Sequence, residues 1–341
     1  MSDAAPSAVP TAWLRSLPKA ELHLHLEGCV SPETLAELSR RPGRDALTVE
    51  QARSLYSYTG FQGFLQAFKT VTDRLRTADD YELITYRMLS ALARQGVAHA
   101  EVNVSVGVVH YWRRTPFERL FEGMERGRLL GEKDFGVSLY WIFDAVRHFG
   151  PEPAAAVFRE AARLRRTSAS VVAIGIGGDE RRGQAALFRD LYREAADAGL
   201  RLTAHAGESD GPESIRGAIE IGAERIGHAL SAQADGELLR LLAERQLPLE
   251  ICISSNVRTG CCPSLPGHPV RRYFDAGLMV TLNSDDPEMF ASNLEQEYQL
   301  AASTFAFSRE NLRRLAANSI HASFLPVERK AVLLHRIERS A

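Results

Sequence analysis

The feature that most constrains the fold is the regular recurrence of short apolar runs, rich in β-branched residues, between longer stretches with helical periodicity. Strands that alternate with helix-length segments are typical of a parallel sheet with crossover helices. Eight such units predict an α/β protein with a (β/α)₈ barrel of the TIM type. We expect the strands at Ala20–Leu26, Val97–Val104, Phe135–Phe143, Val171–Ile176, Leu200–His205, Arg225–His228, Leu249–Ile253 and Leu278–Leu282.

The chain reads as one domain, although 341 residues is long for a single unit. Barrels of this class commonly reach such a length. We expect residues 12–341 to form the domain and residues 1–11, which are small, polar and proline-containing, to form a flexible N-terminal tail. The segment 47–92 has helical character throughout, which predicts extra helices inserted after the first strand.

An aromatic stripe lies inside this inserted segment. Phe61, Phe64, Leu65 and Phe68 recur at helical spacing. Such a stripe usually belongs to the core, and after the first strand of a barrel it can also roof an apolar pocket. Both interpretations remain open from the residues alone.

Charge and composition exclude several classes of partner. The net charge is −2, and no basic run with interleaved aromatic residues is present, which argues against nucleic acid. No stretch resembles a signal peptide or is long enough to span a bilayer. The four cysteines are too few and too irregular for a disulfide framework. We therefore expect a reduced, soluble, cytoplasmic protein, of unknown oligomeric state, that acts on a small molecule.

His23 and His25 form the first candidate metal half-site. Residues at i and i+2 of a strand project from the same face. Two imidazoles at a strand end, followed by Gly28, could hold a divalent transition metal. A pair of surface or core histidines is the plainer alternative, so the choice depends on further ligands.

Further candidate ligands follow other predicted strands. The active site of such a barrel lies at the carboxyl ends of its strands, and His205, His228 and the pair Asp285–Asp286 all occupy such ends. Three imidazoles and a carboxylate suit one Zn²⁺ ion, with a position left for water. The predicted zinc ligands are His23, His25, His205 and Asp285.

Three more residues could supply proton transfer. Glu208 lies three residues beyond a predicted ligand and could protonate a ring nitrogen, which makes the adjacent carbon electrophilic. His228 and Asp286 are the remaining polar groups near the metal. Taken singly, such residues are more often a core histidine or a turn. The glycines of segment 175–178 fit neither a dinucleotide-binding loop nor a P-loop.

Taken together, these residues resemble the adenosine deaminase family, a branch of the metal-dependent amidohydrolases. The matching segments extend from about residue 12 to residue 338, in the order typical of the family. The segments are Leu17–Gly28, Gly178–Glu180, His205–Glu208, Arg225–His228, Ser254–Val257 and Ser284–Pro287. The resemblance implies a zinc-containing barrel that hydrolyses the 6-amino group of a purine and releases ammonia.

The resemblance also implies individual roles. Glu208 would protonate N1 of the purine, and His228 would orient or deprotonate the attacking water. Asp286 would accept a hydrogen bond from the N7 side, and the Gly178 N–H would face N3. Phe64, Leu65 and Phe68 match a helix that covers the purine pocket, and His25 and Glu27 match positions near the substrate.

The substrate is less constrained than the reaction. Adenosine-specific members commonly carry Asp where this chain has Glu27, and adenine-specific members usually have Ser where it has Gly178–Asp179. Arg147, after the third strand, could meet a carboxylate on an extended substrate, although such residues are more often structural. We therefore expect a 5′-extended adenine nucleoside, with 6-amino-6-deoxyfutalosine of menaquinone biosynthesis as the specific hypothesis.

Alternatives of other kinds remain. One is a deaminase of free adenine, and another is a purine-binding relative without catalysis. The latter would have lost a ligand or Glu208, and neither is lost. A two-metal hydrolase would need a lysine at the end of the fourth strand, where this chain has none.

Overall fold

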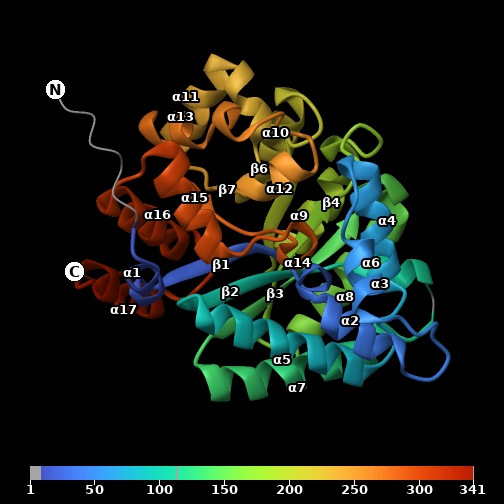
Figure 1. Cartoon of the computed structure of the whole chain (residues 1–341). Helices are drawn as coiled ribbons and strands as arrows, with labels where there is room; N and C mark the ends of the chain where they lie inside the picture. The colour runs from blue at the N-terminus through green and yellow to red at the C-terminus, as the bar shows by residue number, and fades with distance from the viewer. Residues whose placement is uncertain (1–8, 113, 341) are drawn as a thin grey trace.

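Parallel strands form the centre of the molecule. A computed structural model of the protein describes residues 9–112 and 114–340. Within these residues, eight parallel strands form a sheet in the order β1 to β8, and Figure 1 shows the helices arranged around them. The strands are β1 (Lys19–His25), β2 (Val97–Val104), β3 (Ser138–Val146), β4 (Val171–Gly177), β5 (Arg201–Ala206), β6 (Arg225–His228), β7 (Leu249–Ile251) and β8 (Val280–Leu282).

The first and last strands meet through the backbone of Asp285, which follows β8. The His25 N–H donates to the Asp285 carbonyl at 2.9 Å, and the Asp285 N–H donates to the His23 carbonyl at 3.0 Å. These bonds join the carboxyl end of β1 to the segment after β8, and the sheet thereby closes into a barrel. The expected (β/α)₈ TIM-type fold is confirmed.

Helices connect the strands and cover the barrel. The insertion after β1 is helical, as expected, and contains η1 (Glu27–Cys29), α2 (Pro32–Ser39), α3 (Val49–Leu55), α4 (Gly60–Thr72) and α5 (Ala78–Arg94). Further along are α6 (Val106–Trp112), α7 (Phe117–Phe135), η2 (Arg147–Phe149), α8 (Pro151–Arg165), η3 (Ala185–Phe188), α9 (Arg189–Asp197), α10 (Pro212–Glu220), η4 (Leu230–Ala234) and α11 (Gly236–Arg245). After β7 come α12 (Ile253–Arg258), η5 (Leu265–Gly267), α13 (Val270–Asp275), α14 (Pro287–Phe290), α15 (Leu294–Phe305), α16 (Arg309–Ala322) and α17 (Val327–Glu338).

The third strand departs most from the expectation. It runs from Ser138 to Val146 instead of Phe135 to Phe143. Phe135 is the last residue of α7, and Gly136 ends that helix in the left-handed conformation with φ of 72°. Glycine adopts this conformation without steric cost, so the helix stops there and the strand begins two residues later.

The barrel interior contains a buried ion network as well as apolar side chains. The Arg225 guanidinium donates to Glu250 at 2.5 Å and to Glu101, which also contacts His99. All four side chains are almost fully buried. Buried charges are tolerated when they are paired, as they are here.

The two ends of the described chain lie on one side of the molecule. Figure 1 shows α1 (Thr11–Ser16) close to α16 and α17. Most of the expected N-terminal tail, residues 1–11, lies outside the described residues, and Thr11 already belongs to α1. No helix among the described residues combines the length and hydropathy that crossing a membrane requires.

Candidate active site and metal centre

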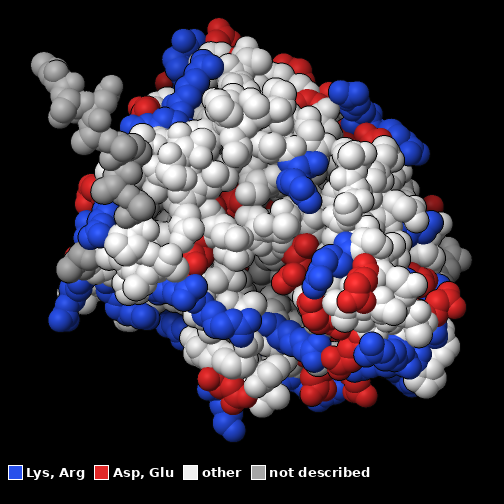
Figure 2. Space-filling model, viewed as in Figure 1, with Lys and Arg blue, Asp and Glu red and all other residues white. Residues whose placement is uncertain are grey.

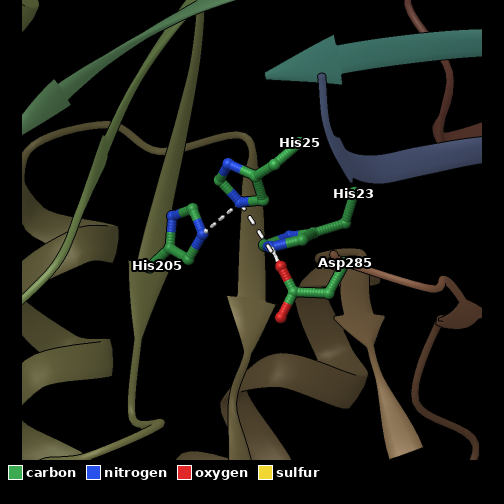
Figure 3. A group of neighbouring side chains, drawn as sticks. All are labelled: His23, His25, His205 and Asp285. Atoms are coloured by element: carbon green, nitrogen blue, oxygen red, sulfur yellow. Dashed lines mark hydrogen bonds and ion pairs between the residues drawn. The ribbon is translucent and has the colours of Figure 1, made fainter. Parts of the chain in front are cut away.

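Four side chains converge at the carboxyl ends of β1, β5 and β8. The structure brings together His23, His25, His205 and Asp285, with one potential ligand atom from each within 4.8 Å of the others. Figure 3 shows these side chains pointing toward one another. The His25 and His205 Nε2 atoms are 3.3 Å apart, and Asp285 Oδ1 lies 3.4 Å from His25 Nε2. We call these four residues the His/Asp cluster.

Hydrogen bonds turn the histidine rings toward the centre of the cluster. His23 Nδ1 lies 2.8 Å from Glu250, and His205 Nδ1 lies 3.1 Å from the Ile176 carbonyl. Each Nδ1–H therefore donates outward and leaves Nε2 facing the cluster. The His23 Nε2 atom is buried and has no hydrogen-bond partner among the described residues. A buried ring nitrogen without a partner is available to bind a metal ion.

The charge states of the cluster suit a divalent cation. Burial lowers the pKa of His25 to about 4 and lowers the pKa of His205 well below its usual value, so both rings are neutral at pH 7. Burial alone would raise the pKa of Asp285, but the hydrogen bond and charge of His23 hold it well below the usual range. His23 differs, because its burial is outweighed by hydrogen bonds to Asp285 and Glu250, which raise its pKa to about 10. Zinc prefers neutral imidazoles and an ionised carboxylate, so its binding would displace a proton from His23.

Glu208 and His228 lie beside the cluster. Glu208 follows β5, and its Oε2 atom is 3.7 Å from Nε2 of His228, the last residue of β6. Burial, with the charges of Asp285 and Glu180, raises the pKa of Glu208 to about 8. Burial, with the charge of His23, lowers the pKa of His228 to about 4. At neutral pH the site thus holds a protonated acid next to a neutral base.

Asp286 completes this polar group. Its Oδ1 atom is buried without a hydrogen-bond partner among the described residues. Burial and the neighbouring charge of Asp285 raise the pKa of Asp286 well above its usual value. An unpartnered polar atom in a cavity wall is available to a ligand.

A cavity of about 330 Å³ opens over these groups. His25, His205, Asp285, Asp286, Glu208 and His228 line its inner end. Figure 2 shows a hollow near the middle of the displayed face, bordered largely by uncharged residues and with acidic side chains inside it. The volume is within the range of small-molecule sites.

Helix α4 supplies the apolar wall of this cavity. Phe61, Phe64, Leu65 and Phe68 all line it, and the Phe64 ring packs 5.0 Å from Phe290 of α14. The stripe therefore faces the cavity as well as the core. A flat aromatic ligand would find apolar surface on this side and polar groups at the inner end.

Gly178 directly follows β4 and also lines the cavity. Its φ is 94°, a conformation that residues with a Cβ rarely adopt. A Cβ at this position would also lie 2.8 Å from His148 Nδ1. Glycine thus allows the backbone to form the cavity wall itself.

Two expected substrate-binding residues do not line the cavity. Glu27 is fully buried, and its carboxylate accepts the Ser105 N–H at 3.1 Å. Arg147 is 1% exposed and donates to the carbonyls of Gly183 at 2.5 Å and His205 at 2.8 Å. The chain turns into η2 directly after β3, so this guanidinium braces backbone instead of facing the cavity.

Glu180 was not singled out from the sequence, although it lies in a matching segment. Its carboxylate accepts the N–H groups of Gly207, Glu208 and Ser209 at 2.7 to 2.9 Å. It therefore fixes the turn that carries Glu208. Its position directly after the Gly178–Asp179 pair was the available signal.

Asp144 was also missed. It lies near the end of β3, lines the cavity, and has a buried Oδ1 without a partner among the described residues. Burial raises its pKa to about 8. The signal was its place directly after the strand expected to end at Phe143.

Comparison with known proteins places this geometry in a family. The family model described as "Adenosine deaminase" matches residues 18–340. The chain belongs to the adenosine deaminase family. As a member of that family, it is a hydrolase that acts on a carbon–nitrogen bond of a cyclic amidine.

Two curated relatives of this adenosine deaminase family member have different substrates in their names. An aminodeoxyfutalosine deaminase of Streptomyces avermitilis is 38% identical over 331 residues, which cover 96% of this chain and 92% of the relative. An adenine deaminase of Rhizobium johnstonii is 36% identical over 330 residues, covering 94% and 99%.

Solved structures agree with the fold. The crystal structure of an adenine deaminase from Arthrobacter aurescens superposes with a TM-score of 0.89 at 33% identity, covering 94% of this chain and 98% of that one. An amidohydrolase from Burkhoderia ambifaria with bound Zn superposes with a TM-score of 0.89 at 25% identity, covering 99% and 96%. A solved structure of the same architecture thus contains zinc.

Proposed function

We propose that this protein catalyses the zinc-dependent hydrolytic deamination of the 6-amino group of an adenine nucleoside. The specific substrate we propose is 6-amino-6-deoxyfutalosine, converted to futalosine in menaquinone biosynthesis in the cytoplasm. The main support for this reaction is that the His/Asp cluster, Glu208 and His228 all lie at the inner end of one cavity.

The ligand set supports one zinc ion per chain, held by His23, His25, His205 and Asp285. When bound, zinc supplies Lewis acidity that activates water near neutral pH. The sequence and the structure retain all four donors, and the relative with bound Zn has the same fold.

The remaining groups account for proton transfer. Glu208, protonated at neutral pH, donates a proton to N1 of the purine ring, which makes C6 more electrophilic. Water adds to C6, and the neutral His228 orients this water and accepts its proton. N7 of an adenine nucleoside carries no hydrogen, so Asp286, whose pKa is raised well above its usual value, donates a hydrogen bond to N7 instead of accepting one. The Gly178 backbone faces N3. His228 then returns its proton to N6, the C6–N6 bond breaks and ammonia leaves. The remaining hydroxyl proton passes to the Glu208 carboxylate as the C6 carbonyl forms, while N1 keeps the proton that it received.

The shape of the cavity supports a nucleoside larger than free adenine. The wall of α4 covers a flat base near the cluster, while the cavity continues to Tyr111 and Phe149, both exposed. Free adenine would leave that outer part empty. Similarity to the Streptomyces enzyme supports the same choice.

Free adenine is the second candidate, because several curated relatives at 34–36% identity are adenine deaminases. Comparing kcat/KM for each substrate with the purified protein distinguishes the two candidate functions. We expect kcat/KM for aminodeoxyfutalosine to exceed the values for adenosine, 5′-deoxyadenosine, methylthioadenosine and adenine, each followed by loss of adenine absorbance. Faster turnover of adenine or adenosine would overturn the proposed substrate.

A further inference from the structure

The outer part of the cavity is built differently from its inner end. Tyr111 is 57% exposed and Phe149 is 37% exposed, and both line the cavity. Their rings stack with centroids 5.3 Å apart and planes 25° apart. Trp112 lies against Tyr111 at 5.5 Å and also lines the cavity. We call Tyr111, Trp112 and Phe149 the aromatic shelf.

The shelf is unusual because its apolar surface faces solvent. Among the described residues, the other large apolar side chains that are exposed are leucines and valines outside this cavity. Exposed aromatic side chains at the mouth of a cavity indicate a surface that a bound ligand would cover.

Lys69 of α4 adds a positive charge beside the shelf. It is the one lysine or arginine among the described residues that line the cavity. Its Nζ atom lies 5.6 Å from the centroid of the Trp112 ring. Among the described residues no carboxylate forms an ion pair with it.

A neighbouring arginine shows the contrast. The Arg114 guanidinium lies 4.8 Å from the same Trp112 ring, but it is paired with Asp73 at 2.5 Å. Arg114 is therefore already neutralised, while the charge of Lys69 is available to a ligand. A lysine ammonium on a flexible stem can reach an anion without rebuilding its surroundings.

The cavity is therefore polarised along its length. Asp285, Asp286, Glu208 and Asp144 lie at the inner end, and Lys69 lies at the outer end. A ligand whose base lies at the inner end would place an anionic group near Lys69, the one lysine or arginine among the described residues that line the cavity. Lys69 lies by Trp112, next to the stacked rings of Tyr111 and Phe149, so this end of the cavity favours a planar aromatic spacer near the anion.

We propose that Lys69 and the aromatic shelf form an outer subsite that binds an aryl carboxylate on the 5′ extension of the nucleoside, which makes Lys69 a specificity-determining residue. This rests on the proposed function, because the base must occupy the inner end. Lys69 would thus bind the substrate carboxylate, a role that the sequence suggested for Arg147.

A double-mutant cycle, in which Lys69 is changed in the protein and the carboxylate is changed in the substrate, tests this assignment. The carboxylate substrate and its carboxamide analogue differ only in the anionic group, and Lys69→Met removes only the ammonium. We expect wild type to favour the carboxylate by about tenfold in kcat/KM, mainly through KM, since one partly exposed charge pair has a modest effect. We expect Lys69→Met to bring the ratio close to one and Lys69→Arg to restore most of it.

Arg114→Met is the matched control, because it removes a cation from the same tryptophan. It should retain the wild-type ratio, since Arg114 is paired with Asp73. Circular dichroism and thermal melting of each variant show whether it is folded. An unchanged ratio in folded Lys69→Met, or an equal loss in Arg114→Met, would overturn the role of Lys69.

A 5′-phosphate is the other anion that Lys69 could bind, and adenosine 5′-monophosphate tests it. If Lys69→Met weakens turnover of this nucleotide but leaves the carboxylate-to-carboxamide ratio unchanged, the aryl carboxylate proposal is wrong. Failure of the proposed function is distinguishable, since it would appear in wild type as preference for adenine or adenosine. If wild type prefers aminodeoxyfutalosine but Lys69→Met keeps the carboxylate-to-carboxamide ratio, the role of Lys69 is wrong and the proposed function stands.

The shelf itself has a separate readout. Phe149→Leu keeps apolar surface but removes the stacked ring beside Tyr111. We expect it to raise KM for the aryl carboxylate about threefold more than for an aliphatic carboxylate of similar length, because stacking adds a small geometric preference to burial. Equal changes for both substrates would contradict a role of the shelf in recognising an aromatic group.

Discussion

A conservative substitution of Glu208 tests proton donation without removing a metal ligand. Glu208→Gln keeps the side-chain shape and the backbone N–H bond to Glu180 but cannot donate the acid proton. We expect kcat to fall by roughly 10²–10⁴-fold while zinc content stays unchanged. Steady-state kinetics and metal analysis of the same sample measure both quantities. Near wild-type turnover would show that another group is the acid.

The pH profile follows from the same residue. Burial raises the pKa of Glu208 to about 8, so its proton-donating form predominates below that pH and is lost above it. We therefore expect kcat/KM to decline as pH rises through about 8. An alkaline limb that persists unchanged in Glu208→Gln would assign the titration to a different group.

Glu250 acts through His23 and not on the substrate. Its carboxylate accepts the Nδ1–H of His23 at 2.8 Å and is itself held by Arg225. Outer partners of this kind change metal affinity by about 10- to 100-fold. We expect Glu250→Gln to weaken zinc binding in that range, as measured by competition with a chelator. Unchanged zinc affinity would show that ring orientation does not depend on Glu250.

At the scale of single elements, β6 must approach β1 closely. A Cβ at Gly227 would lie 2.6 Å from Cε1 of His23, a contact that real structures do not tolerate. We expect Gly227→Ala to displace His23 and to lower zinc content and activity together. Gly211→Ala is the matched control, because a Cβ there has nothing within 4 Å. Full zinc content in Gly227→Ala would contradict this packing argument.

The elements also show what periodicity could predict. Strand β2 has the bounds expected from its pattern, Val97–Val104. Strand β3 begins three residues later than expected, because Gly136 and not the apolar run decides where α7 ends. Apolar runs report burial, whereas element ends depend on turn geometry that a run does not contain.

The same distinction applies to the site. The cluster residues were recognisable because each lies at or shortly after the carboxyl end of a strand, and a barrel brings these strand ends together. Lys69 could not be recognised, because its role depends on which face of α4 meets the cavity. Arg147 was expected near the substrate from its place after β3, but the turn of η2 directs it to the carbonyls of Gly183 and His205.

At the scale of the whole molecule, the barrel combines a metal centre with a cavity that changes character along its length. The ligands come from β1, β5 and the segment after β8, so the centre exists only when the strands at both ends of the sheet meet. The inner end has the groups for deamination, and the outer end has aromatic surface and a cation. The reaction and the substrate preference thus depend on different residues.

The central claim is that the His/Asp cluster holds the zinc that deamination requires. Ammonia release from aminodeoxyfutalosine by metal-depleted protein, before and after addition of about one equivalent of zinc, tests it most directly. The account predicts no release without metal, recovery with zinc, and no recovery in Asp285→Ala. Full ammonia release by protein shown to contain no metal, or no release after zinc binds stoichiometrically, would contradict it.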